Sequence, residues 1–561
     1  MSKMKGAAVL VEMLERYGVR SFFFMSGGPT RIFSEMSERT PQIRQVLTHS
    51  EKAAAYMADG YSRASYRPGV CFGQVGPGAS NLAAGVAEAY LASTPLVALT
   101  GVRQPEVLNR NAYQELEQMR FFDAVTKWNV LVSRTTRIPD VIRGAFRVAT
   151  SGRPRPVHVG LQVDAVDADA DFADLSADKE NSHYPPRRII PDLSAVKDAL
   201  ALLKVARRPV IVAGGGAVVS QAWGEVTTLA EQASVPVTTT LSGKGAISED
   251  HPLSVGVMGR YSRRCANDIV KESDMVFYVG CKVGNLSTDG WTLPPKGTKI
   301  VQVDIEATEI GRNYPVEVGI LGDAKTTLSM MLSMGASGGA HSRAQWVGLS
   351  KRRVKAWKEA ALKLMQSSKV PVSAYRVVHE LQKALGKDGV VVADTGYAAA
   401  WGGVLYSTRQ GRNFYRSAGS LGWAFPGSLG VKLALPDRQV VCLTGDGGFG
   451  YHLTELETSV RHGAPVVVVV LNNGTLAFER HDFKFFLGGK GYEASDYLDT
   501  NFAAIARAFG CAGVKVKAPG DIGGTIDGAL RSGKTTVVDV ATDPEELGPV
   551  TDYQEYVPKA V

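Results

Sequence analysis

Short runs of β-branched and other apolar residues alternate with segments of helical spacing along most of the chain. The runs are apolar at nearly every position, and they lie at residues 69–76, 95–101, 156–161, 209–216, 274–280, 299–305, 390–396, 439–447, 465–473 and 535–542. Strands that are apolar on both faces belong to parallel sheets covered by helices on both sides. The pattern therefore predicts an α/β protein built from doubly wound parallel sheets.

Two polar stretches interrupt this alternation. Residues 167–192 are first acidic and then rich in proline, and residues 334–345 are small and polar. Such composition is typical of linkers. Because 561 residues exceed what a single hydrophobic core organises, we expect three domains, at about 1–170, 190–335 and 365–545.

Composition and charge narrow the class of protein. The first apolar run is interrupted by Glu12 and Glu15, which favours an amphipathic first helix over a signal peptide. No apolar stretch approaches the roughly 20 residues that span a bilayer. The net charge of +8 is modest for this length, so neither nucleic acid nor a membrane is an expected partner. We expect a cytoplasmic protein.

Five cysteines, odd in number and without C-x-x-C spacing, argue against disulfides and against a zinc site; we expect buried thiols. Basic residues cluster only at Arg260, Arg263 and Arg264. There, a solvated surface is favoured over a site for an anionic small ligand.

Several predicted strands end in glycine-rich turns, at 74–81, 212–217, 394–401 and 443–450. In open parallel sheets, the loops at the carboxyl ends of the strands aim backbone N–H groups at phosphates. A glycine after a strand is more often only a turn. Taken singly, these turns are weak evidence for a ligand site.

The segment from Gly445 to Thr475 carries a stronger signal. A buried strand ends in a glycine turn with Asp446 at its tip, a helical spacer over 451–463 follows, and five valines lead to Asn472 and Asn473. In a strand–helix–strand unit both loops reach the same sheet edge, so Asp446 and Asn473 can meet. Carboxylate and amide oxygens suit Mg²⁺ on a diphosphate. The alternative is that Asp446 caps a helix and that Asn472 and Asn473 form a turn.

This two-part motif resembles the thiamine diphosphate and magnesium motif of thiamine-dependent enzymes. The resemblance implies that Asp446, the Asn473 side chain and the Thr475 carbonyl bind Mg²⁺. Residues 49–64 and 76–101 further resemble the pyrimidine-binding domain of acetolactate synthase-like enzymes, and residues 207–313 resemble their central domain. The resemblance implies three α/β domains, with thiamine diphosphate bound between the first domain of one subunit and the third of another, in a homodimer or a homotetramer.

The resemblance assigns further residues. Glu51 matches the glutamate that hydrogen-bonds the pyrimidine and promotes its imino form, although a solvated helix residue is the alternative. His49 stands two positions before it, whereas the family has histidine immediately before it, so no catalytic role is assigned to His49. Leu421 matches the bulky residue that folds the cofactor into a V. Contacts to the cofactor are implied for Gly396, Tyr397, Gly419, Gly447 and Gly448.

Substrate-side residues match less closely. Gln114 and Lys127 are retained from the synthase segment, but Tyr113 replaces its phenylalanine. The glycine loop near the cofactor keeps Gly27 and Gly28 and loses its proline. At 279–291 the synthases have an arginine that grips the second 2-oxo acid, and this chain has Lys282, which keeps the charge but not the planar fork.

Residues 476–495 do not match the synthase segment well. Glu479, Arg480 and His481 are candidates for an acid, an anion clamp and a proton shuttle, although a mobile, solvated loop is favoured. The central domain of relatives holds FAD, or ADP or CoA, and residues 212–217 permit either.

The function expected from these matches is that of a thiamine-diphosphate-dependent lyase or carboligase acting on a 2-oxo acid, with acetolactate synthesis as the best single activity. Three alternatives remain. Two act on an acyl-CoA substrate, namely a 2-hydroxyacyl-CoA lyase and an oxalyl-CoA decarboxylase-like enzyme. The third is a simple 2-oxo acid decarboxylase. A non-catalytic binding protein is disfavoured by Glu51, Asp446 and Asn473. Residues 528–535 fit the P-loop pattern of an ATPase, but a predicted helix precedes them and a strand follows, the reverse of the P-loop order.

Overall fold

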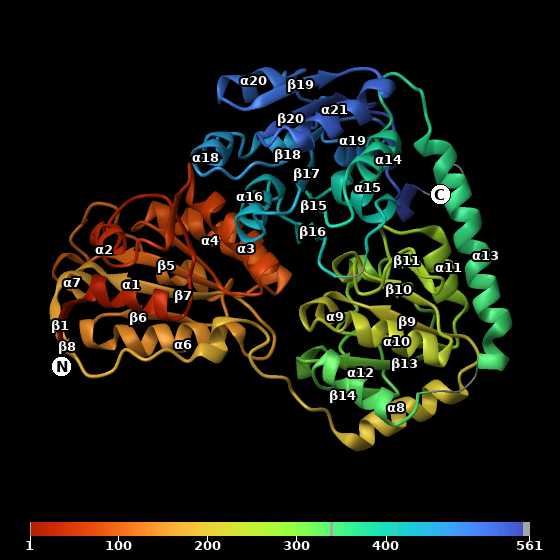
Figure 1. Ribbon diagram of the computed structural model, residues 1–561, viewed down its shortest axis with the longest axis horizontal. Helices are drawn as coiled ribbons and strands as arrows, with labels where there is room; N and C mark the ends of the chain where they lie inside the picture. Colours follow the sequence, from red (N-terminus) through yellow and green to blue (C-terminus); the bar gives the residue numbers. More distant parts are fainter. Residues whose placement is uncertain (1, 337–339, 410, 554–561) are drawn as a thin grey trace.

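The computed structural model describes residues 2–336, 340–409 and 411–553, and its main feature is three six-stranded parallel sheets (Figure 1). Helices lie on both faces of each sheet, which confirms the predicted α/β class. The amino-terminal part lies at the left of Figure 1, the central part at the lower right and the carboxyl-terminal part at the top. In the described residues no helix is long and apolar enough to cross a membrane.

The first sheet has the order β3-β2-β4-β5-β7-β6. Its strands are β2 (Ser21–Phe24), β3 (Arg44–Leu47), β4 (Gly69–Gly73), β5 (Leu96–Val102), β6 (Asn129–Val132) and β7 (Val157–Gln162). The helices of this part are α1 (Gly6–Arg16), α2 (Arg31–Arg39), α3 (Glu51–Ser65), α4 (Pro77–Ala92), α5 (Met119–Asp123), α6 (Ile138–Thr150) and α7 (Val163–Asp167).

The second sheet has the order β11-β10-β9-β12-β13-β14. Its strands are β9 (Pro209–Ala213), β10 (Val237–Thr239), β11 (Ser254–Val257), β12 (Met275–Val279), β13 (Lys299–Asp304) and β14 (Val318–Leu321). Its helices are α8 (Leu193–Val205), α9 (Gly215–Val219), α10 (Trp223–Ala233), α11 (Arg264–Glu272) and α12 (Ala324–Ser333), and α13 (Ala340–Met365) runs along one side of the molecule.

The third sheet has the order β16-β15-β17-β18-β20-β19. Its strands are β15 (Val390–Ala393), β16 (Phe414–Arg416), β17 (Val440–Gly445), β18 (Val467–Asn472), β19 (Ala512–Val516) and β20 (Thr536–Ala541). Its helices are α14 (Ala374–Ala384), α15 (Tyr397–Leu405), α16 (Ala424–Ala434), α17 (Asp446–Gly450), α18 (Glu455–Arg461), α19 (Ala477–Phe486), α20 (Phe502–Ala508) and α21 (Ile522–Arg531).

In each sheet the strand order reverses direction near the middle: between β2 and β4, between β9 and β12, and between β15 and β17. The first and third sheets reverse once more at their far edge, where β7 lies inside β6 and β20 lies inside β19. The loops that leave neighbouring strands at the middle reversal turn to opposite faces of the sheet and open a crevice at its carboxyl edge. The glycine-rich turns of the sequence follow these strands. Each sheet therefore presents glycine-rich backbone where an open α/β sheet binds ligands.

The amino-terminal and carboxyl-terminal parts meet through two helices, α3 and α16. A Cβ on Gly60 of α3 would lie 2.1 Å from the carbonyl oxygen of Gly427, and one on Gly430 of α16 would lie 1.9 Å from that of Met57. The two helix backbones are thus in direct contact, which larger residues at these glycines would prevent. This contact brings α3 and the loop before α16 together.

The predicted linkers differ from what the structure shows. Within 167–192, β8 (Asp169–Phe172) pairs antiparallel with β1 (Ser2–Lys5). Residues 337–339 lie outside the described residues, and α13 begins at Ala340, inside the second predicted linker. The helix thus includes the second half of the polar stretch, and Trp346 and Trp357 anchor it in the core. Small polar residues alone did not identify the point at which the chain re-enters regular structure.

The structure also places the five cysteines, the basic cluster and the segment that fits the P-loop pattern. All five cysteines are free and buried, as expected. The expected solvated surface is wrong for Arg263, which is 1% exposed and pairs with Glu249. Residues 528–535 run from the end of α21 to the residue before β20; because a P-loop runs from a strand into a helix, the match to that motif is accidental.

Candidate active site

A cavity of about 360 Å³ opens at the carboxyl ends of β15, β17 and β18. We call it the cofactor cavity. Nine of the residues that the resemblance assigns to the cofactor or its metal line it: Gly396, Tyr397, Gly419, Leu421, Asp446, Gly447, Gly448, Asn473 and Thr475. Residues that are up to 79 positions apart in the sequence are thus gathered by one sheet edge.

Asp446 and Asn473 meet in this cavity. Strands β17 and β18 pair in parallel, and the Asp446 Oδ2 atom accepts hydrogen bonds from the backbone N–H groups of Asn473 (3.1 Å) and Gly474 (2.6 Å). The Asn473 Oδ1 atom accepts from the N–H of Thr475 at 3.2 Å. The two loops that the sequence placed at one edge are therefore in contact.

The Asp446 carboxylate lacks a cationic side-chain partner among the described residues, although it is only 6% exposed. Burial raises the pKa of Asp446, and N–H donors, Gly447 and Gly474 foremost, oppose the rise. A buried anion without a cation is the environment that a bound metal ion compensates. The described residues contain no group of three or more His, Cys, Asp or Glu side chains placed to hold a metal ion, so an ion here would take amide, carbonyl and ligand oxygens as well.

The glycines of the cavity leave room for a ligand. Gly396 has a φ of +68°, a Cβ added there would meet nothing within 4 Å, and Gly419 is equally open. A Cβ on Gly447 would approach Leu476 at 2.7 Å, and one on Gly448 would approach Asp394 Oδ2 at 2.6 Å. Gly396 and Gly419 therefore leave open space at the cavity, whereas Gly447 and Gly448 let the backbone of α17 pack closely against Leu476 and Asp394.

Asp394, which directly follows β15, is a structural part of the site that the sequence analysis missed. Its carboxylate accepts from the N–H of Gly422 at 3.1 Å and from the Thr444 hydroxyl at 3.1 Å. Burial raises its pKa to about 7. Asp394 thereby ties the loop that carries Leu421 to the end of β17. An acid directly after a buried strand was the available signal.

Helix α19 forms another wall, where a solvated loop was favoured. Glu479, in its first turn, lines the cavity, whereas Arg480 is held by Asp496 (2.8 Å) and Glu545 (3.1 Å) and does not line it. The anion-clamp hypothesis for Arg480 is therefore wrong. His481 is fully buried, and its Nδ1 atom lies 2.5 Å from the Tyr397 hydroxyl. Tyr397 lines the cavity while His481 holds its hydroxyl.

The other predicted residues form a second group, at the edge of the first sheet. Glu51 is the first residue of α3, whose N-cap Ser50 accepts from the N–H of Ala53. Its carboxylate is buried, with the residue 5% exposed, and accepts from Asn81 Nδ2 at 3.2 Å. A Cβ on Gly78 would lie 2.7 Å from Glu51 Oε1, so the glycine turn after β4 lies directly against this carboxylate.

Two glutamines that the sequence analysis did not single out brace this group. Gln118 Oε1 accepts from the N–H of Gly76 at 2.8 Å, and its Nε2 donates to Gly101 O at 2.6 Å. Gln74 fills the space beside Gly27 and Gly78.

Backbone contacts hold the remaining predicted residues of this group. Gln114 adopts a φ of +63°, and its carbonyl packs against Gly76. A Cβ on Gly101 would lie 2.4 Å from the carbonyl oxygen of Gly28. The glycine loop at Gly27 and Gly28 is therefore packed against the ends of β4 and β5.

The two groups do not share one cavity within the described residues of a single chain. Glu51, Gly27, Gly28 and Gln114 are not among the residues that line the cofactor cavity. His49 bonds Glu457 of α18 at 2.9 Å, away from it. Each group is held by its own hydrogen bonds and packing. Each contains only some of the residues that the resemblance assigns to the cofactor.

Other substrate-side candidates lie elsewhere. Lys127 donates to the carbonyl of Arg153 at 3.2 Å, and burial lowers its pKa. Tyr113 is 80% exposed. Lys282 donates to Leu91 O at 3.0 Å and lines a separate cavity of about 670 Å³ at the carboxyl edge of the second sheet. We call this the central cavity.

Comparison with protein families finds a matching domain in each of the three parts of the chain. Residues 4–121 match the amino-terminal thiamine pyrophosphate (TPP) binding domain of thiamine pyrophosphate enzymes, 196–331 match their central domain, and 394–540 match their carboxyl-terminal TPP binding domain. The chain belongs to this family. It is a thiamine-pyrophosphate-dependent enzyme, and the cofactor cavity lies in its carboxyl-terminal TPP binding domain.

Similarity to individual relatives extends over almost the whole chain. A "Probable acetolactate synthase large subunit" of Methanococcus aeolicus is 33% identical over 96% of this chain and 92% of its own length. A protein of the same name from Methanocaldococcus jannaschii is 32% identical over 98% and 93%. Isozyme 3 of the acetolactate synthase large subunit of Escherichia coli is 28% identical over 97% and 96%.

Proposed function

We propose that this enzyme is an acetolactate synthase-like carboligase, which decarboxylates a 2-oxo acid and transfers the remaining fragment to an acceptor carbonyl. The observation that supports it most is the meeting of Asp446 and Asn473 in a glycine-lined cavity, in a chain similar over almost its full length to acetolactate synthase large subunits.

Thiamine diphosphate, when bound, supplies a thiazolium carbon that adds to carbonyls and takes up electrons as a C–C bond breaks. In this chain Asp446, Asn473 and the Thr475 carbonyl would hold Mg²⁺ on its diphosphate. Gly447 and Gly448 would let the protein backbone approach the diphosphate closely. Gly396, Tyr397 and Gly419 would form the facing wall. Leu421 would support the bent cofactor, and Glu51 would hold a proton at the pyrimidine.

The assay that tests this function offers the protein with thiamine diphosphate and Mg²⁺ a panel of 2-oxo acids, and measures CO₂ and coupled products. Pyruvate should yield acetolactate. CO₂ with an aldehyde and no coupled product would instead identify a decarboxylase, and turnover only with acyl-CoA substrates would identify a lyase of that class.

A second copy of the chain completes the site in this proposal. Glu51 and the cofactor cavity are each formed in one chain, but Glu51 does not line that cavity. We therefore propose that Glu51 of one copy serves the cavity of another, in a cytoplasmic homodimer or in a tetramer built from such dimers. The single chain also exposes large apolar side chains, such as Leu498 at 89% exposure, and an interface between copies would cover surface of this kind.

Mixing two inactive variants tests this arrangement. In a dimer of Glu51→Gln and Asp446→Asn chains, one site regains both wild-type groups and the other loses both. Equal co-expression makes half of all dimers mixed, so we expect about a quarter of wild-type activity, although each variant alone is inactive. A mixture that stays inactive while mixed dimers are isolated by two affinity tags would contradict the shared site.

Glu479 is the substrate-side acid in this proposal. It lines the cofactor cavity, and partial desolvation raises its pKa. A proton donor acts only while protonated, so activity should fall as the pH rises through the pKa of Glu479. In Glu479→Gln we expect activity to be lower by about 10²-fold, and we expect it to change less as the pH rises through this range. The exposed Glu493→Gln serves as control, and an unchanged pH profile in Glu479→Gln would exclude the role.

The central cavity is proposed to hold an adenine nucleotide such as FAD or ADP. It lies where the strand order reverses between β9 and β12, and Gly215, Gly216, Asp304 and Ser287 are among its lining residues. Backbone at the start of α9 suits a phosphate, and an acid at the end of β13 suits a ribose hydroxyl. Isothermal titration with FAD, ADP and CoA tests the assignment, and no binding of any of the three would reject it.

A further inference from the structure

The loop that carries Leu421 separates the two cavities. Residues 417–422, here called the cofactor loop, lie between β16 and α16. Gly419 and Leu421 line the cofactor cavity, whereas Ala418 and the preceding Arg416 line the central cavity. The conformation of this loop therefore sets the shape of both cavities.

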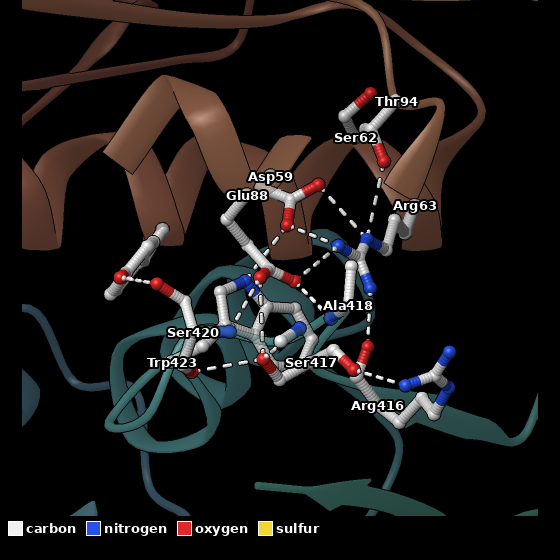
Figure 2. Close-up of polar contacts among 12 residues, drawn as sticks. Asp59, Ser62, Arg63, Glu88, Thr94, Arg416, Ser417, Ala418, Ser420 and Trp423 are labelled. Carbon is white, nitrogen blue, oxygen red and sulfur yellow. Dashed lines mark hydrogen bonds and ion pairs between the residues drawn. The ribbon is translucent and has the colours of Figure 1, made fainter. Parts of the chain in front are cut away.

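A carboxylate on a helix of the amino-terminal part fixes this loop. Glu88 lies on α4 of the amino-terminal part, and its Oε2 atom accepts from the N–H of Ser420 at 3.0 Å and from the Ser417 hydroxyl at 3.3 Å. Its Oε1 atom accepts from the N–H of Ala418. Figure 2 shows these bonds converging on Glu88 from the turn of the loop.

Arg63 of α3 links Glu88 to both ends of the loop. Its Nη2 atom donates to Glu88 Oε1 at 3.3 Å, and its Nη1 atom donates to the carbonyl of Arg416 at 2.6 Å. The guanidinium also lies over the Trp423 ring, 4.4 Å from its centroid. The residues just before and just after the cofactor loop thus contact one arginine.

Asp59 completes the network. It accepts from Arg63 Nε at 2.9 Å and from the Trp423 indole N–H at 2.8 Å (Figure 2). The side chains of Asp59 and Glu88 are both 0% exposed. Since only Arg63 among these three groups is cationic, the second buried negative charge relies on the backbone N–H donors of the loop.

This dependence is mutual. Without Glu88, two backbone N–H groups of the loop lose their acceptor in a buried place, where an unmade hydrogen bond is costly. On its other side the loop is held by Asp394, through the N–H of Gly422. Glu88 and Asp394 thus hold the two sides of the short segment that presents Gly419 and Leu421 to the cofactor cavity.

We propose that Glu88 is a positioning residue, which holds the cofactor loop in the conformation that binds thiamine diphosphate. It acts through Ala418 and Ser420, not by touching the cofactor. The inference rests on the proposed function of the cofactor cavity, and it adds a residue of the amino-terminal part that acts on this cavity within the same chain.

Titration calorimetry with thiamine diphosphate and Mg²⁺ tests the proposal on Glu88→Gln. We expect a Kd raised by roughly tenfold or more, a KM for the cofactor raised in proportion, and a kcat at saturating cofactor within about threefold of wild type. Hydrogen exchange of peptides covering 416–423 should be faster. A Kd and an exchange rate equal to wild type would overturn the proposal.

The matched control is Glu309→Gln. Glu309 is 6% exposed and pairs with Arg153 at 2.7 Å across the amino-terminal and central parts, but no hydrogen bond joins it to the cofactor loop in the described residues. It should lose stability in a similar way and keep the wild-type Kd. If both variants weakened binding equally, the effect would be general destabilisation, which also overturns the proposal.

A milder variant decides the matter if Glu88→Gln does not fold. Glu88→Asp keeps the buried charge but shortens the side chain by one methylene, so that its carboxylate no longer reaches the N–H groups of both Ala418 and Ser420. A Kd raised severalfold supports the proposal, and an unchanged Kd overturns it. Failure of the wild-type protein to bind thiamine diphosphate would instead reject the proposed function of the cavity.

Discussion

Replacing Glu51 by glutamine should abolish turnover, by about 10³-fold or more, while the affinity for thiamine diphosphate stays within about tenfold of wild type. The substitution is nearly isosteric and keeps an acceptor for Asn81, so α3 should still begin at residue 51. It removes the one ionisable group that this proposal assigns to proton exchange with the pyrimidine. Product formation and calorimetry on the same preparation measure the two effects.

The control for this variant is His49→Asn, two residues away. His49 has a side chain 41% exposed and bonds Glu457, so we expect activity within about threefold of wild type. Comparable losses in both variants would point to a disturbed segment instead of a proton at residue 51. Full activity of Glu51→Gln would remove the assigned role.

The fold could be predicted because its signals are local. Runs such as 465–471 are apolar at consecutive positions, and a run of this length and β-branched content is typical of a strand buried on both faces. The meeting of Asp446 and Asn473 followed from the same logic, since neighbouring parallel strands deliver their loops to one edge. No knowledge of long-range packing was needed for either.

What the sequence could not reveal depends on contacts between sheets. Glu88 lies in a small-residue helix, and nothing in residues 77–92 signals that its partners are 330 and 332 positions away. Arg63 and Asp59 have the spacing of an ordinary i, i+4 pair on a helix surface, yet both are buried against Trp423. Only the packing of α3 on α16 decides between a solvated pair and an interior network.

The same dependence on packing explains why the anion-clamp hypothesis for Arg480 was wrong. Its charge, next to Glu479 and His481, fitted an anion site, but the side chain turns to Asp496 and Glu545. The first turn of α19 sends Glu479 toward the cofactor cavity, and the next residue is then carried about 100° around the helix. Which of three consecutive polar residues faces a ligand depends on where the helix begins, and local composition does not determine that point.

Asp446→Asn should remove the Mg²⁺-dependent part of cofactor binding. In the wild-type protein we expect chelation of Mg²⁺ to weaken thiamine diphosphate binding strongly, because Asp446 and Asn473 act on the diphosphate through the ion. The variant should bind the cofactor at least about 100-fold more weakly in Mg²⁺, since losing even an outer-shell partner of a metal ligand costs about 10–100-fold. Its affinity with and without chelator should then be nearly equal.

This equality is what distinguishes a metal ligand from a structural residue. Asp446 Oδ2 also accepts from the N–H groups of Asn473 and Gly474, so the substitution will loosen both loops, and a drop in affinity alone could have that cause. A loosened site would still bind more tightly with Mg²⁺ than without it, whereas a site deprived of its metal would not respond to the ion. The exposed Asp437→Asn should keep the full wild-type response, and a persistent Mg²⁺ response in Asp446→Asn would move the ion to other ligands.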